Sequence, residues 1–302
     1  MKILANDGLN EMAVKILTKA GHDVITQHVP QDELISYINN NQIETILVRS
    51  ATKVRENLIK ECPNLKFIGR AGVGVDNIDI DFAKQADRIV FNTPSASSRS
   101  VAELIMGLIY SWNRGIHHSH YSIASYSFKE LKKELESGRE VLGQTIGIIG
   151  FGRIGREVAK LAQANGLRVL VHDPYLPEEL SHMQTSKDKL LAEADFVTIH
   201  VSGSDEILNE NDFELMKPTA VVMNASRGGC VNEEDLIKCI EAKKIAGACL
   251  DTFIDEPNPW NHLLNHHNVL ATPHIGGSTV EAQERIGIEL ASKLLEYVEQ
   301  KA

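Results

Sequence analysis

Three stretches of the sequence place side chains that can handle a proton or an anion just after runs of apolar residues. Arg227 follows Ala-Val-Val-Met-Asn-Ala-Ser, Glu256 comes five residues after Ala-Cys-Leu-Asp251, and His274 follows Val-Leu-Ala-Thr-Pro. Ligands of parallel α/β sheets bind beyond the carboxyl ends of the strands, so we expect these side chains at one edge of a sheet. An imidazole can move a proton, a carboxylate can orient it, and a guanidinium can bind a substrate carboxylate through two hydrogen bonds.

A glycine-rich turn lies upstream of these stretches. Gly150-Phe-Gly152-Arg-Ile-Gly155 comes between Thr-Ile-Gly-Ile-Ile and an amphipathic stretch. Gly150 permits a tight turn, Gly152 lets the backbone approach a pyrophosphate, and Gly155 lets helix and strand pack closely. Asp173 ends the next apolar run, where a carboxylate accepts hydrogen bonds from ribose hydroxyls and repels a 2′-phosphate. The pattern predicts NAD rather than NADP, and with the three polar side chains it indicates hydride transfer at an α-carbon; a turn that binds nothing stays the alternative.

Short β-branched runs alternate with amphipathic stretches in two series, which predicts an α/β protein with two doubly wound parallel-sheet domains. The chain length of 302 residues and its apolar content of 43% also suit two cores. In the first series we expect strands at 3–5, 23–26, 45–48, 66–68 and 88–91 and helices at 11–19, 32–38 and 55–61. In the second we expect strands at 145–150, 168–173, 196–201, 220–226, 245–251 and 269–274, with helices near 153–165, 187–194, 215 and 233–243.

A long apolar helix is expected between the two series, from Val101 to Tyr110. Ser100 and Glu103 fit a capping box at its start. Its apolar surface exceeds what one small domain needs, which suggests a subunit contact. Residues 129–139 are rich in charge and are expected to be solvated, and a last helix is predicted from Thr279 to about residue 298.

The composition narrows the possible partners. Lys and Arg number 31 against 41 Asp and Glu, a net charge of −10 that argues against nucleic acid or an anionic membrane as a partner. A small anionic substrate would need a local basic pocket. The four cysteines show no metal or disulfide spacing, and the start is too short for a signal peptide, so a cytoplasmic protein is expected. Histidine groups at 117–120 and 262–267 lack accompanying ligands, so no metal is expected.

Several stretches together resemble the D-isomer-specific 2-hydroxyacid dehydrogenases. They are Arg70-Ala-Gly-Val-Gly-Val-Asp-Asn-Ile-Asp79, Asn92-Thr-Pro94 and the three stretches that carry Arg227, Glu256 and His274, and the likeness covers nearly the whole chain. The resemblance implies that Arg227 binds the substrate carboxylate, that Glu256 pairs with His274, and that His274 is the acid and base. It also implies NAD-contacting residues at Gly150, Gly152, Arg153, Ile154, Gly155, Asp173, His200, Val201, Ala225, Ser226, Asp251, Gly276 and Gly277, and substrate-binding residues at Arg49, Ser50, Lys53, Arg70, Gly72, Val73 and Gly74.

The same resemblance implies a domain layout. A Rossmann NAD-binding domain, residues 98–280, would be inserted into a flavodoxin-like substrate domain, residues 1–97 plus 281–302, with a cleft between them that closes on the substrate. The resemblance also implies a homodimer formed through the cofactor domains. No C-terminal regulatory domain is expected after Ala302.

Within the family, the runs around Arg49 and Arg70 are most similar to members that oxidise 3-phosphoglycerate to 3-phosphohydroxypyruvate, the first step of serine synthesis. A glyoxylate or hydroxypyruvate reductase, or another D-2-hydroxyacid dehydrogenase, is the alternative with the same chemistry. A protein of this fold that senses NAD as a transcriptional co-repressor is an alternative of another class.

Overall fold

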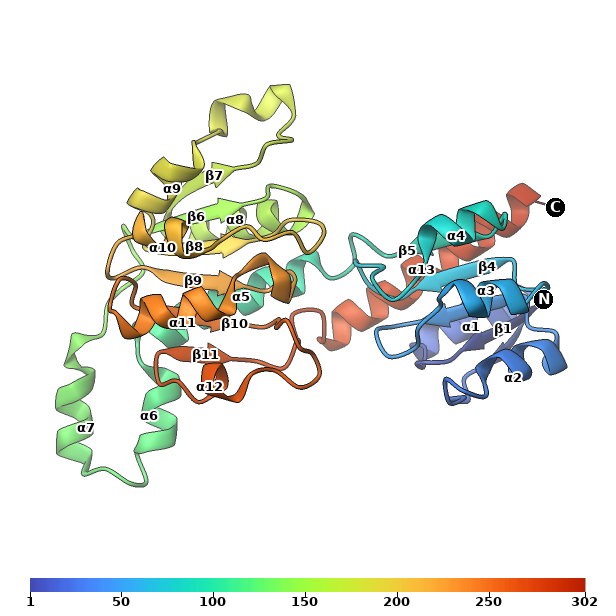
Figure 1. Cartoon of the computed structure of the whole chain (residues 1–302), viewed down its shortest axis with the longest axis horizontal. Helices are drawn as coiled ribbons and strands as arrows, with labels where there is room; N and C mark the ends of the chain where they lie inside the picture. Colours follow the sequence, from blue (N-terminus) through green and yellow to red (C-terminus); the bar gives the residue numbers. More distant parts are fainter. Residues whose placement is uncertain (302) are drawn as a thin grey trace. The chain divides into compact units, whose positions relative to one another are not determined.

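The computed structural model describes residues 1–301 and divides them into two compact units (Figure 1). The first unit joins residues 1–97 to the segment that begins at Gly277, and the second contains residues 98–276. The sequence led us to expect the second boundary after residue 280. In the structure the boundary lies after Gly276, and residues 277–280 are grouped with the first unit. The roles expected for the two units stay predictions.

The first unit is built on a five-stranded parallel sheet in the order β2-β1-β3-β4-β5, the flavodoxin-like arrangement. Its strands are β1 Lys2–Ala5, β2 Asp23–Ile25, β3 Thr45–Val48, β4 Phe67–Arg70 and β5 Ile89–Asn92. Its helices are α1 Glu11–Lys19, α2 Leu34–Asn41, α3 Glu56–Glu61, α4 Ile80–Gln85 and α13 Val280–Lys301.

Helix α13 completes the first unit from the far end of the sequence. It packs on α1, and Leu290 and Leu294 are fully buried in the same core as Ile3 and Leu17. The helix begins after Thr279, whose hydroxyl accepts a hydrogen bond from the backbone N–H of Ala282 at 3.1 Å. The last helix therefore belongs to the core of the N-terminal sheet.

The second unit is built on a six-stranded parallel sheet in the order β11-β10-β9-β8-β6-β7. Its strands are β6 Thr145–Ile149, β7 Arg168–His172, β8 Phe196–Ile199, β9 Val221–Asn224, β10 Gly247–Leu250 and β11 Val269–Ala271. Its α-helices are α5 Ser98–Asn113, α6 Ile116–Ser122, α7 Phe128–Glu134, α8 Arg153–Ala164, α9 Lys187–Glu193, α10 Glu210–Glu214, α11 Glu233–Glu241 and α12 Asn261–Leu264. Three 3₁₀ helices complete it: η1 Leu135–Ser137, η2 Glu178–Met183 and η3 Gly228–Cys230.

Helices cover both faces of this sheet (Figure 1). One apolar cluster joins the sheet to α5 and α8, through residues such as Ile105 and Val158. The other joins the opposite side to α9, α10 and α11, through residues such as Leu190, Phe213 and Leu236. Strands buried on both sides carry continuous apolar runs, which is why the four central runs were readable in the sequence. The predicted fold class is confirmed.

The capping box predicted for α5 is wrong. The helix begins at Ser98, two residues before the expected cap, and Ser100 donates its hydroxyl hydrogen to the carbonyl oxygen of Gly276 at 2.6 Å. Glu103 pairs with Arg99 at 2.7 Å instead of capping the helix. The apolar face of α5 is largely buried within the unit against α8 and the sheet, and the subunit contact expected of this helix stays a prediction.

Five of the exposed large apolar side chains of the second unit lie further along, on α6, α7 and their connection. We call residues 116–134 the arm; it extends from the body of the unit in Figure 1. Tyr121 and Phe128 on the arm are 82% and 74% exposed. Among the helices of residues 1–301, none combines the length and apolar character that crossing a bilayer requires.

Candidate active site

The imidazole of His274 and the carboxylate of Glu256 lie side by side beyond the carboxyl ends of β10 and β11. Nδ1 of His274 is 2.8 Å from Oε2 of Glu256. Burial opposes ionisation of Glu256, but hydrogen bonds from His274 and the Phe253 N–H, with the charges of His274 and Arg227, lower its pKa. An ionised Glu256 requires a proton on Nδ1, so Nε2 of His274 is left to exchange a proton with a ligand.

The segment that carries His274 is held by Asp251, which directly follows β10. One carboxylate oxygen accepts hydrogen bonds from the Thr272 hydroxyl at 2.6 Å and the Ile275 N–H at 2.8 Å, and the other accepts from the Gly276 N–H at 2.8 Å. His274 itself has a φ of 52°, in the left-handed region that a non-glycine residue seldom adopts. Three hydrogen bonds to a buried carboxylate offset the cost of this conformation and fix the imidazole.

Arg227 lies in a loop that is shaped by Asn224, the last residue of β9. The Asn224 amide donates to the carbonyl oxygen of Arg227 at 2.7 Å, and its oxygen accepts from the Ser226 N–H and hydroxyl. The Arg227 guanidinium donates to the carbonyl oxygen of Ser226 at 2.7 Å and is half-buried. The loop therefore presents a guanidinium at the same edge of the sheet as His274 and Glu256.

The glycine loop fits a dinucleotide at the point where the strand order reverses. Gly150 follows β6 with a φ of 90°, and a Cβ there would come within 2.6 Å of the carbonyl oxygen of His200, which follows β8. A Cβ on Gly155 would collide with the carbonyl oxygen of Gly150, whereas one on Gly152 would meet nothing within 4 Å. Gly152 thus leaves open space beside the first N–H groups of α8, where a pyrophosphate binds in this fold.

Asp173 supports the same fit. It follows β7, and its Oδ2 accepts a hydrogen bond from the Phe151 N–H in the glycine loop at 2.7 Å. Its Oδ1 accepts from the Tyr175 N–H at 2.9 Å. Each carboxylate oxygen can accept more than one hydrogen bond, so both can still receive ribose hydroxyls. The half-buried carboxylate is thereby placed beside the glycine loop, and the residues present fit NAD.

His200 is more enclosed than its predicted role as a cofactor contact requires. The side chain is buried, and burial lowers its pKa to about 3, so the ring is neutral. Nε2 lies 2.9 Å from the Thr198 hydroxyl, while Nδ1 has no partner among the described residues. The backbone carbonyl group of His200, rather than its ring, is what an added Cβ on Gly150 would meet.

The other residues predicted to contact NAD are divided between the two units. Arg153 and Ile154 begin α8, Val201 follows His200, and Ala225 and Ser226 follow β9. Gly276 is held by Asp251, and Gly277 is grouped with the first unit. Within residues 1–301, no group of three or more His, Cys, Asp or Glu side chains is placed to hold a metal ion.

The residues predicted to bind substrate lie at the carboxyl edge of the sheet in the first unit. Arg49, Ser50 and Lys53 follow β3 and are exposed, whereas Arg70 ends β4 and is half-buried. A Cβ on Gly72 would collide with the Arg70 guanidinium, so the glycine makes room for that side chain. Val73 and Gly74 continue the same turn, and the Asn92 amide donates to the carbonyl oxygen of Val73 at 2.5 Å.

Two residues that hold the loop after β3 were not identified from the sequence. Asp7, which follows β1, accepts hydrogen bonds from the N–H groups of Arg49 and Thr52 at 2.6 and 3.1 Å and from the Thr52 hydroxyl at 2.6 Å. The buried Asn77 amide donates to the carbonyl oxygens of Arg49 and Thr52. A polar residue at or just beyond the end of a buried strand was the available signal for Asp7, as it also was for Asn224 in the second unit.

This combination of a doubly wound sheet, a glycine loop, a strand-end aspartate and a histidine-carboxylate pair defines a nucleotide-dependent oxidoreductase. Residues 106–276 match the family described as D-isomer specific 2-hydroxyacid dehydrogenase, NAD binding domain. The chain belongs to this family, its cofactor is NAD, and it is an NAD-dependent D-2-hydroxyacid dehydrogenase.

Individual relatives agree with this assignment. A hydroxypyruvate reductase of Thermotoga maritima is 42% identical, and the match covers 97% of each chain. A D-3-phosphoglycerate dehydrogenase of Methanocaldococcus jannaschii is 39% identical over 97% of this chain, which spans only 57% of that relative. Among solved structures, a D-lactate dehydrogenase from Aquifex aeolicus complexed with NAD and lactic acid is 28% identical with a TM-score of 0.79, covering 99% of this chain and 96% of that one.

Proposed function

We propose that His274 is the acid and base of the reaction, that Glu256 orients it, and that Arg227 binds the carboxylate of the substrate. The contact of 2.8 Å between Nδ1 of His274 and Oε2 of Glu256 carries this proposal. NAD, when bound, accepts the hydride from the α-carbon or returns it. In the oxidation, Nε2 of His274 takes the hydroxyl proton, and Glu256 stabilises the imidazolium that forms. In the reduction, the same nitrogen gives that proton back.

We further propose 3-phosphoglycerate as the substrate, oxidised to 3-phosphohydroxypyruvate for serine synthesis. Relatives named D-3-phosphoglycerate dehydrogenase are 36–40% identical to this chain, for example 39% in Methanocaldococcus jannaschii and 40% in Archaeoglobus fulgidus. Arg49 and Lys53 supply exposed cationic groups that could bind a phosphate. A hydroxypyruvate reductase is the second candidate, because the Thermotoga maritima relative of that name has nearly the same length.

A panel of paired substrates distinguishes the two. NADH formation from 3-phosphoglycerate and D-glycerate, which differ only in the phosphate, is compared with NADH consumption by hydroxypyruvate and glyoxylate. We expect kcat/KM for 3-phosphoglycerate to exceed that for D-glycerate, and Lys53→Ala to reduce the former while sparing the latter. Equal or better use of the substrates without phosphate would exclude the serine-pathway role and favour the reductase.

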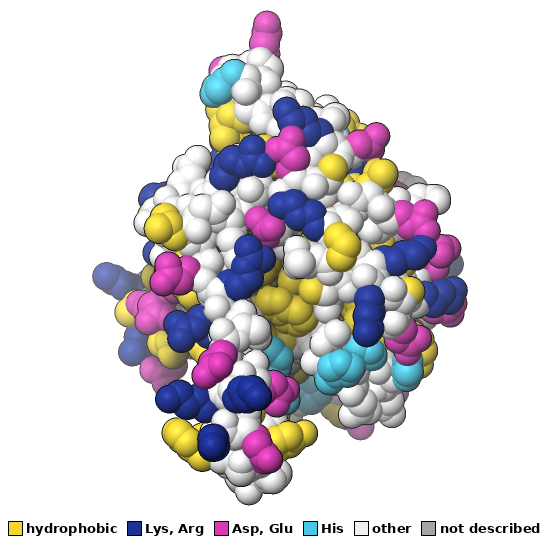
Figure 2. All heavy atoms as spheres, turned by 90° about the vertical axis from the view of Figure 1, so that its left-hand side faces the viewer, with side chains coloured by type: hydrophobic (Ala, Val, Ile, Leu, Met, Phe, Trp, Pro, Cys, Tyr) yellow, Lys and Arg dark blue, Asp and Glu magenta, His cyan; other side chains and the backbone are white. Residues whose placement is uncertain are grey.

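We propose that the second unit forms a homodimer and that the arm contributes to the contact. The arm exposes Ile116, Tyr121, Ile123, Tyr126 and Phe128, each more than half exposed to solvent. Figure 2 views the molecule from the side on which the arm lies in Figure 1, and hydrophobic side chains are exposed there among charged ones. A soluble monomer rarely leaves so many large apolar groups on one segment, and a second copy would cover them.

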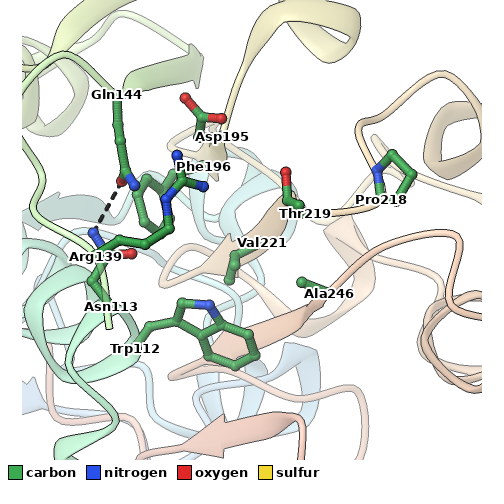
Figure 3. A pocket seen from close by; sticks show the side chains of 10 residues that line it. All are labelled: Trp112, Asn113, Arg139, Gln144, Asp195, Phe196, Pro218, Thr219, Val221 and Ala246. Carbon is green, nitrogen blue, oxygen red and sulfur yellow. Dashed lines mark hydrogen bonds between the residues drawn. The ribbon is translucent and has the colours of Figure 1, made fainter. Parts of the chain in front are cut away.

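A hollow of about 190 Å³ at the amino edge of the sheet gives this contact a second component (Figure 3). Phe196 and Val221, at the starts of β8 and β9, are part of its wall. Trp112 and Arg139 flank the apolar part, as Figure 3 shows. An apolar side chain of a second copy would fit such a lining, whereas the groups assigned to catalysis lie at the other edge.

The oligomeric state tests this proposal. Mass measurement by light scattering after size exclusion should give a dimer for the unmodified chain and a smaller species for Phe128→Glu. Met12→Glu, at an exposed position of the first unit that is 42% accessible, serves as the control and should stay dimeric. A monomer for the unmodified chain would contradict the proposal.

We also propose a cytoplasmic location, which suits the four free and buried cysteines.

A further inference from the structure

The backbone around the Phe253–Ile254 peptide lies just before Glu256 and is held at two consecutive N–H groups. The Phe253 N–H donates to Oε1 of Glu256 at 3.0 Å, and the Ile254 N–H donates to Oε1 of Glu233 at 2.8 Å. Two consecutive backbone donors are therefore taken by two different carboxylates. One of these carboxylates is the proposed partner of His274, and the mechanism gives the other no role.

Glu233 comes from the connection that carries Arg227. It is the first residue of α11, and η3 lies between it and Arg227. The same connection touches the peptide a second time at Gly228, where a Cβ would collide with the carbonyl group of Phe253 and with the nitrogen of Ile254. The loop after β10 is thus fastened to the loop after β9 by a close backbone approach and by one carboxylate hydrogen bond.

A carboxylate is a costly side chain at this place. Glu233 is 7% exposed, and burial, together with the nearby charges of Asp255 and Glu256, raises its pKa although the Ile254 N–H acts in the opposite direction. The start of a helix offsets part of this cost, because the N-terminus of α11 carries a partial positive charge. Glu234, the next residue of the same turn, is exposed and avoids the cost altogether.

We propose that Glu233 is a positioning residue of the dehydrogenase. It ties the Glu256 loop to the Arg227 loop, so that the pair of Glu256 and His274 keeps its register to the guanidinium that binds the substrate carboxylate. The inference rests on the proposed roles of Glu256, His274 and Arg227. A shift of about 1 Å between a proton-transfer group and a bound substrate is enough to lower turnover about a hundredfold.

Kinetics of four variants test this role, with turnover and NADH affinity measured separately. Glu233→Ala removes the acceptor, and Glu233→Asp keeps the charge but shortens the side chain; we expect each to lower kcat by about 10- to 100-fold. Glu233→Gln keeps an acceptor oxygen at the same distance and should restore kcat to within about threefold of the unmodified enzyme. Glu234→Ala is the matched control and should change neither quantity. NADH affinity, measured by fluorescence, should change less than about twofold in all four.

Glu256→Gln is measured beside them to separate the positioning role of Glu233 from the proposed function of the pair of Glu256 and His274. If Glu256→Gln loses turnover while Glu233→Ala and Glu233→Asp keep it, the positioning role is wrong and the proposed pair stands. If Glu256→Gln also keeps full turnover, the proposed function of the pair is wrong. Should Glu233→Ala fail to fold, Glu233→Asp and Glu233→Gln decide: equal losses in both, or none in either, would overturn the inference.

Discussion

The two edges of the six-stranded sheet differ in what their loops do. At the carboxyl edge, buried polar side chains at the ends of β9 and β10 shape the loops, as Asn224 and Asp251 do. At the amino edge, Phe196 and Val221 line a hollow with Trp112, and the arm beyond it exposes large apolar side chains (Figures 1 and 3). At the carboxyl edge, buried polar groups fix the geometry of the loops. At the amino edge and on the arm, apolar surface is left uncovered.

The comparison shows which kind of interaction each edge of the sheet requires. Loops that must hold a proton-transfer group within hydrogen-bond reach need internal hydrogen bonds, since side-chain packing alone leaves a loop too free. A surface that meets another copy of the chain needs only complementary apolar area. Substitutions at the carboxyl edge should therefore change chemistry at little cost in assembly, and substitutions at the amino edge should do the reverse.

The largest expected effect is at His274. His274→Asn removes the proton-transfer group while keeping a polar side chain of smaller volume, and kcat should fall by about 10²- to 10⁴-fold. NADH affinity and the dimer should persist, which fluorescence titration and light scattering would show. A loss of turnover of less than about tenfold would contradict the acid and base role.

The next-largest effect on kcat/KM is expected at Arg227. Replacing one arginine by glutamine at each edge of the sheet gives a matched comparison. Arg227→Gln removes a charged, two-pronged contact to the substrate carboxylate and should reduce kcat/KM by about 10- to 100-fold. Arg139→Gln, at the hollow of the amino edge, should leave kcat/KM within about twofold. Comparable losses from the two substitutions would break the contrast between the edges.

A smaller effect is expected at Asp173. Asp173→Ala removes the acceptor proposed for the ribose hydroxyls and the repulsion of a 2′-phosphate, so KM for NAD should rise by about tenfold. The ratio of kcat/KM for NADP to that for NAD should rise with it. If the unmodified enzyme already uses NADP as well as NAD, the role of this carboxylate is disproved.

The smallest expected effect is on stability and follows from the raised pKa of Glu233. In the folded protein burial disfavours its ionised form, so stability falls as the pH rises from the ordinary carboxyl range through the raised pKa and stays reduced above it. Glu233→Gln removes this loss. The difference in Tm between variant and unmodified protein should therefore be more favourable by a few degrees at about pH 7 than at about pH 4. A difference that does not depend on pH would contradict this.

Features that depend on short spacing in the sequence could be predicted. The glycine loop with Asp173 after the next strand was readable because each residue type serves the backbone geometry next to it. The buried strands were readable as apolar runs, and the three polar stretches pointed to one edge of the sheet.

Features that depend on tertiary partners could not be predicted from local pattern. Ser100 and Glu103 have the spacing of a capping box, yet the hydroxyl of Ser100 bonds to Gly276, which lies far away in the sequence. The role of Glu233 needs a second loop, and nothing near α11 in the sequence identifies Ile254 as its partner. The use of the apolar face of α5 depends likewise on its packing against α8.

The most direct test of the central claim is a double-mutant cycle on kcat with His274→Asn, Glu256→Gln and the variant that combines them. If Glu256 acts by orienting and stabilising His274, its substitution should matter only while the imidazole is present. The account predicts that the double variant turns over about as fast as His274→Asn alone. A double variant slower than His274→Asn by the full factor that Glu256→Gln causes on its own would show that the two residues act independently and would contradict the account.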